Sequence, residues 1–208
     1  GTLIDEENTL ATRYQVSRVV IRDAVKILVG KGLLDVRRGI GTRVRARNQW
    51  SMLDDDVLAW HLSAPPNPAF LKQLMEIRLA FEPKASRWAA ERATDEDIAE
   101  IEAACVAMEQ EGGSVENFVI ADAEFHRAVL RSAHNEFLKA MEGVIYSALL
   151  VSIRLTNKDP RENKTSVPFH RAVCNAITAH DGDLAEELTA NLLNDADHRL
   201  DGNVANYA

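Results

Sequence analysis

The chain has 208 residues, of which 46% are hydrophobic, 27% charged and 6% aromatic, a composition typical of one large or two small globular domains. Two cysteines are too few for a disulfide framework, and no apolar run approaches the roughly 18 residues of a membrane span, so we expect a cytoplasmic protein without signal peptide or membrane partner. The net charge of -8 is unevenly spread, because residues 1–48 carry 10 Lys and Arg against 5 Asp and Glu, whereas the remainder carries 14 against 27.

The basic residues 1–48 are predicted to form one unit. Its expected elements are a helix over 9–14, a tight turn at 15–17, a helix over 18–29 and two short strands over 33–37 and 42–45. Ser17 supplies an N-cap for the second helix, and Gly30 ends it. Helix, turn, helix and hairpin follow one another in the order of a winged helix-turn-helix domain.

Cationic side chains gather on one side of the second predicted helix. Arg18, Arg22 and Lys26 are spaced four residues apart, so they lie along one face. An arginine near the start of such a helix fits the major groove of DNA, where its guanidinium bonds the O6 and N7 atoms of guanine. Arg38 stands at the tip of the hairpin, next to a glycine that lets the turn approach a DNA backbone. The alternative is a solvated, charged helix that contacts no DNA.

Residues 49–66 are expected to form a linker that contains a short helix over 53–62. Three consecutive aspartates occupy the first turn of this helix, where the helix dipole favours acidic side chains. Pro65 and Pro66 follow it and prevent the helix from continuing.

Residues 67–208 form the second predicted unit, which is acidic and almost entirely helical. Helices are expected over 68–92, 95–111, 115–133, 136–157, 165–180 and 184–200. Thr94 precedes three acidic residues and is a good N-cap, while Gly112 and Gly113 separate two helices. The expected fold class is therefore mainly α: a winged helix-turn-helix followed by an all-α antiparallel helical bundle.

The predicted bundle contains a candidate metal site. Asp122 and His126 are four residues apart and lie on one face of a helix, while His170 and Asn194, on two later helices, can converge with them. Carboxylate, imidazole and amide oxygen suit a divalent metal such as zinc, manganese or nickel, and the spacing does not choose among these. The alternative for Asp122 and His126 is a surface ion pair.

The basic unit carries a resemblance to a known family. The residues that carry it include Leu10-Ala11, Val16-Ser17-Arg18, Ile21-Arg22-Asp23-Ala24 and Gly39-x-Gly41-Thr42. Together they resemble the winged helix of the GntR family of bacterial transcription regulators. The resemblance implies a homodimer on a palindromic operator in double-stranded DNA, with Ser17, Arg18, Arg22 and Arg38 at the DNA. Asn8 stands where the family often has a base-contacting arginine, and asparagine reads adenine instead. The family's domain begins with a further helix, which is expected upstream of Gly1.

Four segments of the helical unit carry a second resemblance, namely residues 76–83, 89–94, 121–126 and 170–177. They are similar to the FCD effector domain of the FadR subfamily over about residues 69–200. This implies a divalent metal held by Asp122, His126 and His170, with Asn194 in the place of the family's last histidine. It also implies a small carboxylate effector at the open positions of the metal. A likeness of the linker and of residues 88–94 to members that respond to sugar acids favours an aldonate or a uronate.

Two arginines are candidates for binding the carboxylate of this effector. Arg78 matches an arginine of the FCD family that often faces the cavity, and a guanidinium binds a carboxylate with two hydrogen bonds. The alternative for Arg78 is a salt bridge to Glu82, four residues further on. Arg154, late in the fourth predicted helix, is the second candidate.

The sequence thus predicts a ligand-responsive transcription regulator, most simply a repressor, and not an enzyme. Its expected partners are operator DNA, a small organic acid and a second copy of the chain. Two alternatives stay open: a helical metalloenzyme that acts on a small carboxylate, and a DNA-binding protein whose bundle binds no ligand.

Overall fold

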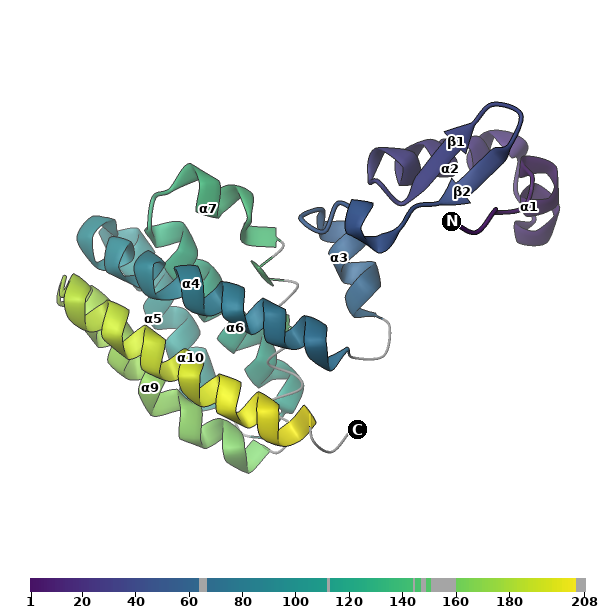
Figure 1. Cartoon of the computed structure of the whole chain (residues 1–208). Coiled ribbons are helices and arrows are strands. Elements are labelled where there is room, and N and C mark those ends of the chain that lie inside the picture. The colour runs from purple at the N-terminus through teal and green to yellow at the C-terminus, as the bar shows by residue number, and fades with distance from the viewer. Residues whose placement is uncertain (64–66, 112, 144, 147–148, 151–159, 205–208) are drawn as a thin grey trace. The chain divides into compact units, whose positions relative to one another are not determined.

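The computed structural model describes residues 1–63, 67–111, 113–143, 145–146, 149–150 and 160–204. The chain divides into two compact units, Gly1–His61 and Leu62–Ala208, and each is considered by itself (Figure 1).

The first unit is a winged helix-turn-helix. It contains α1 (Glu7–Tyr14), α2 (Arg18–Gly30), β1 (Leu34–Arg37), β2 (Gly41–Val44), a 3-10 turn (Arg47–Gln49) and most of α3 (Asp55–Leu62). Gln15 ends α1 in the left-handed region at φ +55°, which turns the chain toward α2. The Ser17 hydroxyl then accepts a hydrogen bond from the Val20 amide at 3.3 Å, as expected of an N-cap. The predicted order of elements is confirmed.

The hairpin forms an antiparallel pair in which Leu34 lies opposite Val44. The N-terminal segment, which was not predicted as a strand, runs along β2: the Ile4 amide donates to the Thr42 carbonyl at 3.0 Å. Ile21 and Leu34 are the buried apolar side chains of α1, α2 and the hairpin, so the hydrophobic core of this part is small.

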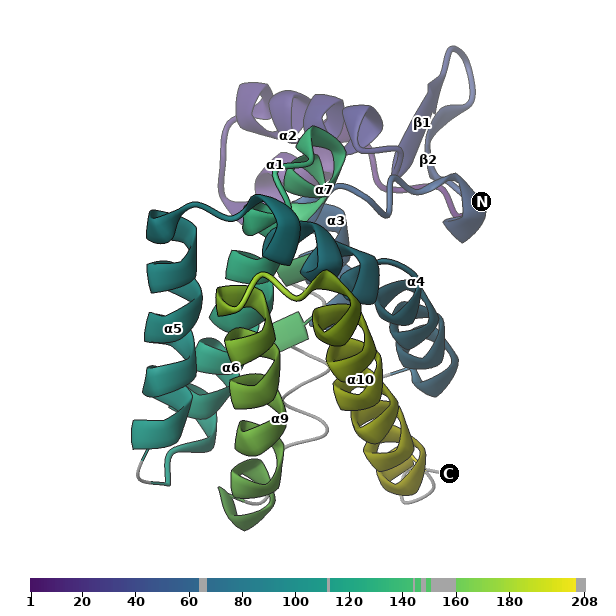
Figure 2. The same cartoon turned by 90° about the vertical axis from the view of Figure 1, so that its left-hand side faces the viewer.

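The second unit is a helical bundle (Figure 2). Its named helices are α4 (Pro68–Arg92), α5 (Asp95–Gln110), α6 (Val115–Ser132), α7 (Glu136–Ala140), α9 (Pro160–Thr178) and α10 (Gly182–Val204). Side-chain caps set several starts: Thr94 and Asp97 form a reciprocal capping box at α5, and Ser114 caps α6. Five of the six predicted helices correspond to these elements. Among the described helices, none is long and apolar enough to cross a lipid bilayer.

The predicted helix over 136–157 is interrupted. α7 ends at Ala140, and the amide of Met141 bonds to the carbonyls of both Phe137 and Leu138, which tightens the last turn. Residues 142–143, 145–146 and 149–150 are helical, while residues 144, 147–148 and 151–157 lie outside the described residues. Leu138, before the break, and Ile145, after it, belong to the same core cluster.

The interior of the bundle contains polar groups as well as apolar ones. α4 packs against α10 and α6, while α9 packs against α10 and α5 (Figure 2). The buried polar and charged side chains of this unit are Arg78, Glu82, Ser86, Asp122, His126, Ser132, Ser166, His170 and Thr189. A buried charge is costly unless it is paired, so the pairing of this group defines the candidate site.

Candidate metal centre and DNA-binding surface

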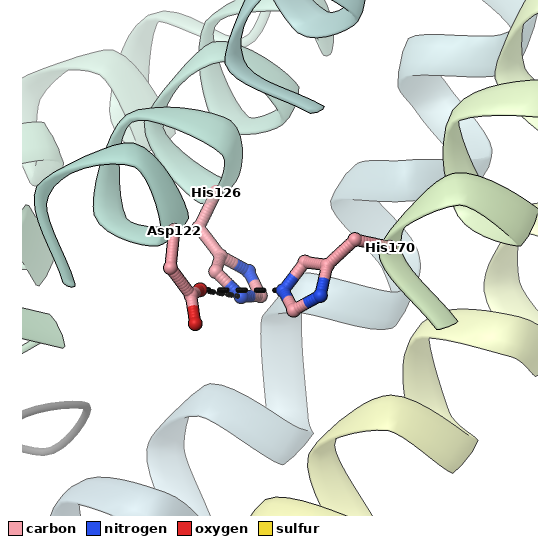
Figure 3. A group of neighbouring side chains, drawn as sticks. All are labelled: Asp122, His126 and His170. Carbon is pink, nitrogen blue, oxygen red and sulfur yellow. Dashed lines mark hydrogen bonds and ion pairs between the residues drawn. The ribbon is translucent and has the colours of Figure 1, made fainter. Parts of the chain in front are cut away.

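Asp122 and His126 from α6 meet His170 from α9 inside the bundle. Figure 3 shows the three side chains pointing toward one another from the two helices. The Asp122 Oδ1 atom lies 3.3 Å from His126 Nε2 and 3.2 Å from His170 Nε2. The possible ligand atoms of the three residues lie within 4.8 Å of one another, and all three residues are buried. The surface ion pair considered for Asp122 and His126 is therefore excluded.

Packing against one aromatic ring holds both imidazoles. Phe125 is 1% exposed and meets the rings of His126 and His170 edge-on, with ring centroids 5.7 Å and 5.0 Å apart. An edge-to-face contact is a preferred aromatic geometry, so the rings are oriented by the core as well as by hydrogen bonds.

The other nitrogen of each imidazole also has a partner. His126 Nδ1 lies 2.8 Å from Glu82 Oε2, and His170 Nδ1 lies 2.9 Å from the backbone carbonyl of Ser166. A neutral imidazole has only one N–H, and when Nδ1 donates it, Nε2 is left with a lone pair. The two Nε2 lone pairs and Asp122 Oδ1 are then three potential ligand atoms that lie close together.

Arg78 completes the buried charge cluster. Its Nε lies 2.6 Å from Glu82 Oε1, its Nη2 lies 3.3 Å from Glu82 Oε2, and the same Nη2 lies 3.4 Å from His126 Nε2. The salt bridge to Glu82, one of the two expectations for Arg78, is present, and the same guanidinium also reaches His126.

These contacts shift the pKa values of the cluster. Burial raises the pKa of Glu82, but the charges of Arg78 and His126 outweigh it and lower that pKa to about 2. Burial likewise opposes ionisation of Asp122, yet His170 and His126 hold the pKa of its carboxyl well below the usual range. Burial alone would lower the pKa of His126, but the nearby carboxylates of Glu82 and Asp122 outweigh burial, so the pKa of His126 is raised.

The donor set fits a divalent metal. One carboxylate oxygen and two imidazole nitrogens are the ligands of many catalytic and sensory sites that keep a position open, and they suit zinc, manganese or nickel. The acceptors behind the two Nδ1 atoms are the outer partners that usually orient metal-bound histidines.

A second cluster of charges lies on the first unit. Arg22 Nη2 lies 3.0 Å from Glu7 Oε2, and Arg18 Nη2 lies 3.9 Å from the same oxygen. The hydrogen bond from Arg22 lowers the pKa of Glu7. Glu7 on α1 therefore holds two arginines of α2 on one exposed face, and Arg38 is exposed on the hairpin.

Two family models match this chain. One, for the bacterial regulatory proteins of the gntR family, matches residues 1–44, and the other, for the FCD domain, matches residues 73–195. The chain belongs to the GntR family and carries an FCD domain. GntR-family proteins are transcription regulators rather than enzymes, and they bind operator DNA and small-molecule effectors.

Relatives and solved structures agree with this family. The chain is 35% identical to the galactonate operon transcriptional repressor of Escherichia coli K12, over 96% of this chain and 88% of that protein. It is 32% identical to the regulator LutR of Bacillus subtilis 168, over 89% and 85%. Two solved structures share the fold: Escherichia coli McbR/YncC (TM-score 0.59, 18% identity, 99% and 88% covered) and Streptococcus agalactiae GntR (0.55, 23%, 95% and 90%).

Not every expected ligand of this GntR-family chain joins the site. Asn194 is exposed, so α10 does not bring it to the three buried residues. A small cavity beside His126 is instead lined by Thr189 and Leu192 of α10. Ala185, Thr189 and Leu192 are buried and mark the inner side of α10. Asn194 is nine residues after Ala185, a rotation of about 180° around the helix axis, so it lies on the opposite side of the helix.

Arg78 and Arg154 are the arginines expected to bind an effector. Arg154 lies outside the described residues, and two nitrogens of Arg78 are engaged by Glu82. Arg199, which is not among the residues predicted from the sequence, has buried Nε and Nη1 atoms without a hydrogen-bond partner within the part of the chain that the structure describes. Its Nη2 lies 3.1 Å from Asp195. Arg199 follows Leu192 by seven residues and so lies on the same side of α10.

The outer partners of the histidines were also missed. Glu82 was considered only as an ion-pair partner of Arg78, and Ser166 was not considered. The role of Glu82 depends on the packing of α4 against α6, which the spacing within one helix does not reveal, whereas Ser166 lies one turn before His170 in the same helix. Of the residues predicted to bind DNA, Asn8, Arg18, Arg22 and Arg38 are exposed, while Ser17 acts as the cap of α2.

Proposed function

We propose that this chain is a ligand-responsive transcription repressor that senses a small organic acid at a divalent metal in its helical unit. Asp122, His126 and His170 would hold the metal. The observation that carries the proposal is the buried convergence of one carboxylate oxygen and two imidazole nitrogens, each imidazole anchored through its other nitrogen. A bound metal would supply a Lewis acid that takes carboxylate and hydroxyl oxygens of the effector.

A sugar acid, either an aldonate or a uronate, is the effector class that we favour. The repressor of the galactonate operon is similar over nearly its whole length, and its name supports an acid of this kind. The buried and unmet donors of Arg199 support a second contact to a polar or anionic group of the effector.

The first unit would bind the operator through α2 and the hairpin. Arg18, Arg22 and Arg38 are exposed and cationic, and Asn8 lies on α1 near the same surface. We place the DNA-binding domain at residues 1–48, the linker at 49–66 and the effector domain at 67–208. A homodimer would present two such units to a palindromic site, spaced by one turn of DNA.

Effector binding would alter operator affinity through the helical unit. Asp122 and His126 belong to α6, and the contacts of His126 with Arg78 and Glu82 reach α4, the first helix after the linker. Coupling between two sites of a regulator amounts to about 1–3 kcal/mol, or roughly 5- to 150-fold in affinity.

A thermal-shift experiment tests this function. The protein is stripped with a chelator, reloaded with zinc, manganese or nickel, and melted with galactonate, gluconate, glucuronate, lactate or citrate. A ligand at 100 times its Kd adds about 2.7 kcal/mol to the free energy of unfolding, which raises the Tm by roughly 5–11 °C. We expect such a shift for a sugar acid in the metal-loaded protein alone. No shift with any acid would identify a ligand-blind regulator, and an equal shift without metal would refute the metal-centred site.

A further inference from the structure

The carboxylate of Glu82 lies behind His126, on the side of the ring away from Asp122. His126 Nδ1 is 2.8 Å from Glu82 Oε2, whereas His126 Nε2 is 3.3 Å from Asp122 Oδ1. The Glu82 side chain is 3% exposed and that of His126 is 6% exposed. Water therefore does not compete for this contact, and it has a defined direction.

The direction of this contact decides which nitrogen of His126 is free to bind a metal. A neutral imidazole can carry its proton on either nitrogen, and only the nitrogen without the proton is a ligand. Carboxylates lie beside both nitrogens, but Glu82 is closer to Nδ1 (2.8 Å) than Asp122 is to Nε2 (3.3 Å), and the Arg78 Nη2 donor lies 3.4 Å from Nε2, so the form with the proton on Nδ1 is favoured. That form leaves the lone pair on Nε2, the atom that faces Asp122 and His170.

Arg78 fixes Glu82 in turn. Two nitrogens of its guanidinium bond the two Glu82 oxygens at 2.6 Å and 3.3 Å, which prevents the carboxylate from rotating away from the ring. His170 is held differently, since its Nδ1 lies against the carbonyl of Ser166, one turn earlier in the same helix. His126 is therefore held by a charged side chain from another helix, whereas His170 is held by a neutral carbonyl of its own helix.

We propose that Glu82 is a positioning residue of the metal centre, which holds the His126 ring with Nδ1 protonated so that Nε2 is available as the ligand atom. The inference rests on the proposed metal-centred function. It predicts that loss of the Glu82 carboxylate weakens metal binding although Glu82 is not itself a ligand. Outer partners of metal-bound histidines typically contribute 10- to 100-fold in affinity, and we expect a loss of about that size.

Two variants separate this role from a structural one. Glu82→Gln keeps the size and one weaker acceptor, but it leaves the buried Arg78 without its counter-ion. The double variant Arg78→Met with Glu82→Leu removes both charges, so no unpaired charge remains to unfold the bundle. Glu186→Gln is the matched control, because Glu186 also pairs with cations of α4, namely Lys84 and Arg87, outside the buried cluster.

Metal affinity is measured by competition with a chromophoric chelator, using zinc and manganese alone, after circular dichroism has shown that each variant is folded. We expect roughly 10- to 100-fold weaker binding in both Glu82 variants and unchanged binding in the control. Unchanged affinity in the folded double variant would overturn the inference. A wild-type protein that binds no metal would overturn the proposed centre, and that result is distinct from equal binding by wild type and variant.

A second readout monitors the ring itself. Long-range proton–nitrogen NMR correlations in the metal-free protein, recorded at a pH where His126 is neutral, show which nitrogen carries the proton, and a His126→Asn spectrum identifies its signals. We expect the Nδ1–H form in the wild type and a mixture of both forms in the double variant. The same form in both proteins would contradict the positioning role.

Discussion

Asp122→Asn removes the charge of the acceptor shared by the two histidines while keeping the size of the side chain. Oδ1 lies 3.3 Å and 3.2 Å from the two Nε2 atoms, so this oxygen would be a ligand of the same metal as the two histidines. An amide oxygen is a weaker ligand than a carboxylate. Changes to outer partners alone cost about 10- to 100-fold in metal affinity, so we expect a loss of roughly 100-fold or more when a ligand itself is altered.

This loss converts into a measurable change in stability. At a fixed, saturating metal concentration, a 100-fold weaker Kd removes about 2.7 kcal/mol of ligand-linked stabilisation and lowers the Tm of the metal-loaded protein by roughly 5–11 °C. The assay is a melting curve with and without zinc, accompanied by chelator competition. Asp197→Asn is the control, since Asp197 pairs with Lys72 rather than with the histidines. Equal metal affinity in Asp122→Asn and wild type would refute the assignment of Asp122 as a ligand.

Three further predictions concern other parts of the chain. Arg22→Ala should weaken binding to an operator selected from a random duplex library by roughly 5- to 150-fold in fluorescence anisotropy, and unchanged affinity would exclude α2 from the interface. Arg199→Gln should weaken sugar-acid binding in calorimetry while leaving zinc affinity unchanged, and an unaltered acid affinity would exclude Arg199 from the effector site. Gly32→Ala should lower the free energy of unfolding by about 1–3 kcal/mol, because Gly32 has φ +75° and a Cβ would lie 2.8 Å from the Gln49 carbonyl oxygen; an unchanged denaturant midpoint would contradict this.

The sequence predicted those features that depend on local spacing. Thr94 marks a helix start because its cap acts within three residues, and the structure has this cap. Asp122 and His126 were placed on one face by their spacing of four residues. The sequence alone places His170 on a separate helix that can converge with these two residues, and the resemblance to the FCD domain supports it as a ligand.

The features that were not predicted depend on how helices pack. Counting along the last helix pointed to Asn194, but the rotation of α10 in the bundle turns Thr189 and Leu192 toward His126 instead. The contact between Glu82 and His126 joins α4 to α6, and no spacing within α4 reveals it. The break at Met141 was likewise not predicted, and the structure has Leu138 before it and Ile145 after it in one core cluster.

The most direct test of the account measures operator affinity in four states: with and without zinc, and with and without a sugar acid that shifts the melting temperature. The account predicts that the acid weakens operator binding by about 5- to 150-fold in the zinc-loaded protein and has no effect after the metal has been removed. An acid effect of equal size in the metal-free protein, or an operator affinity that no acid changes, would contradict it.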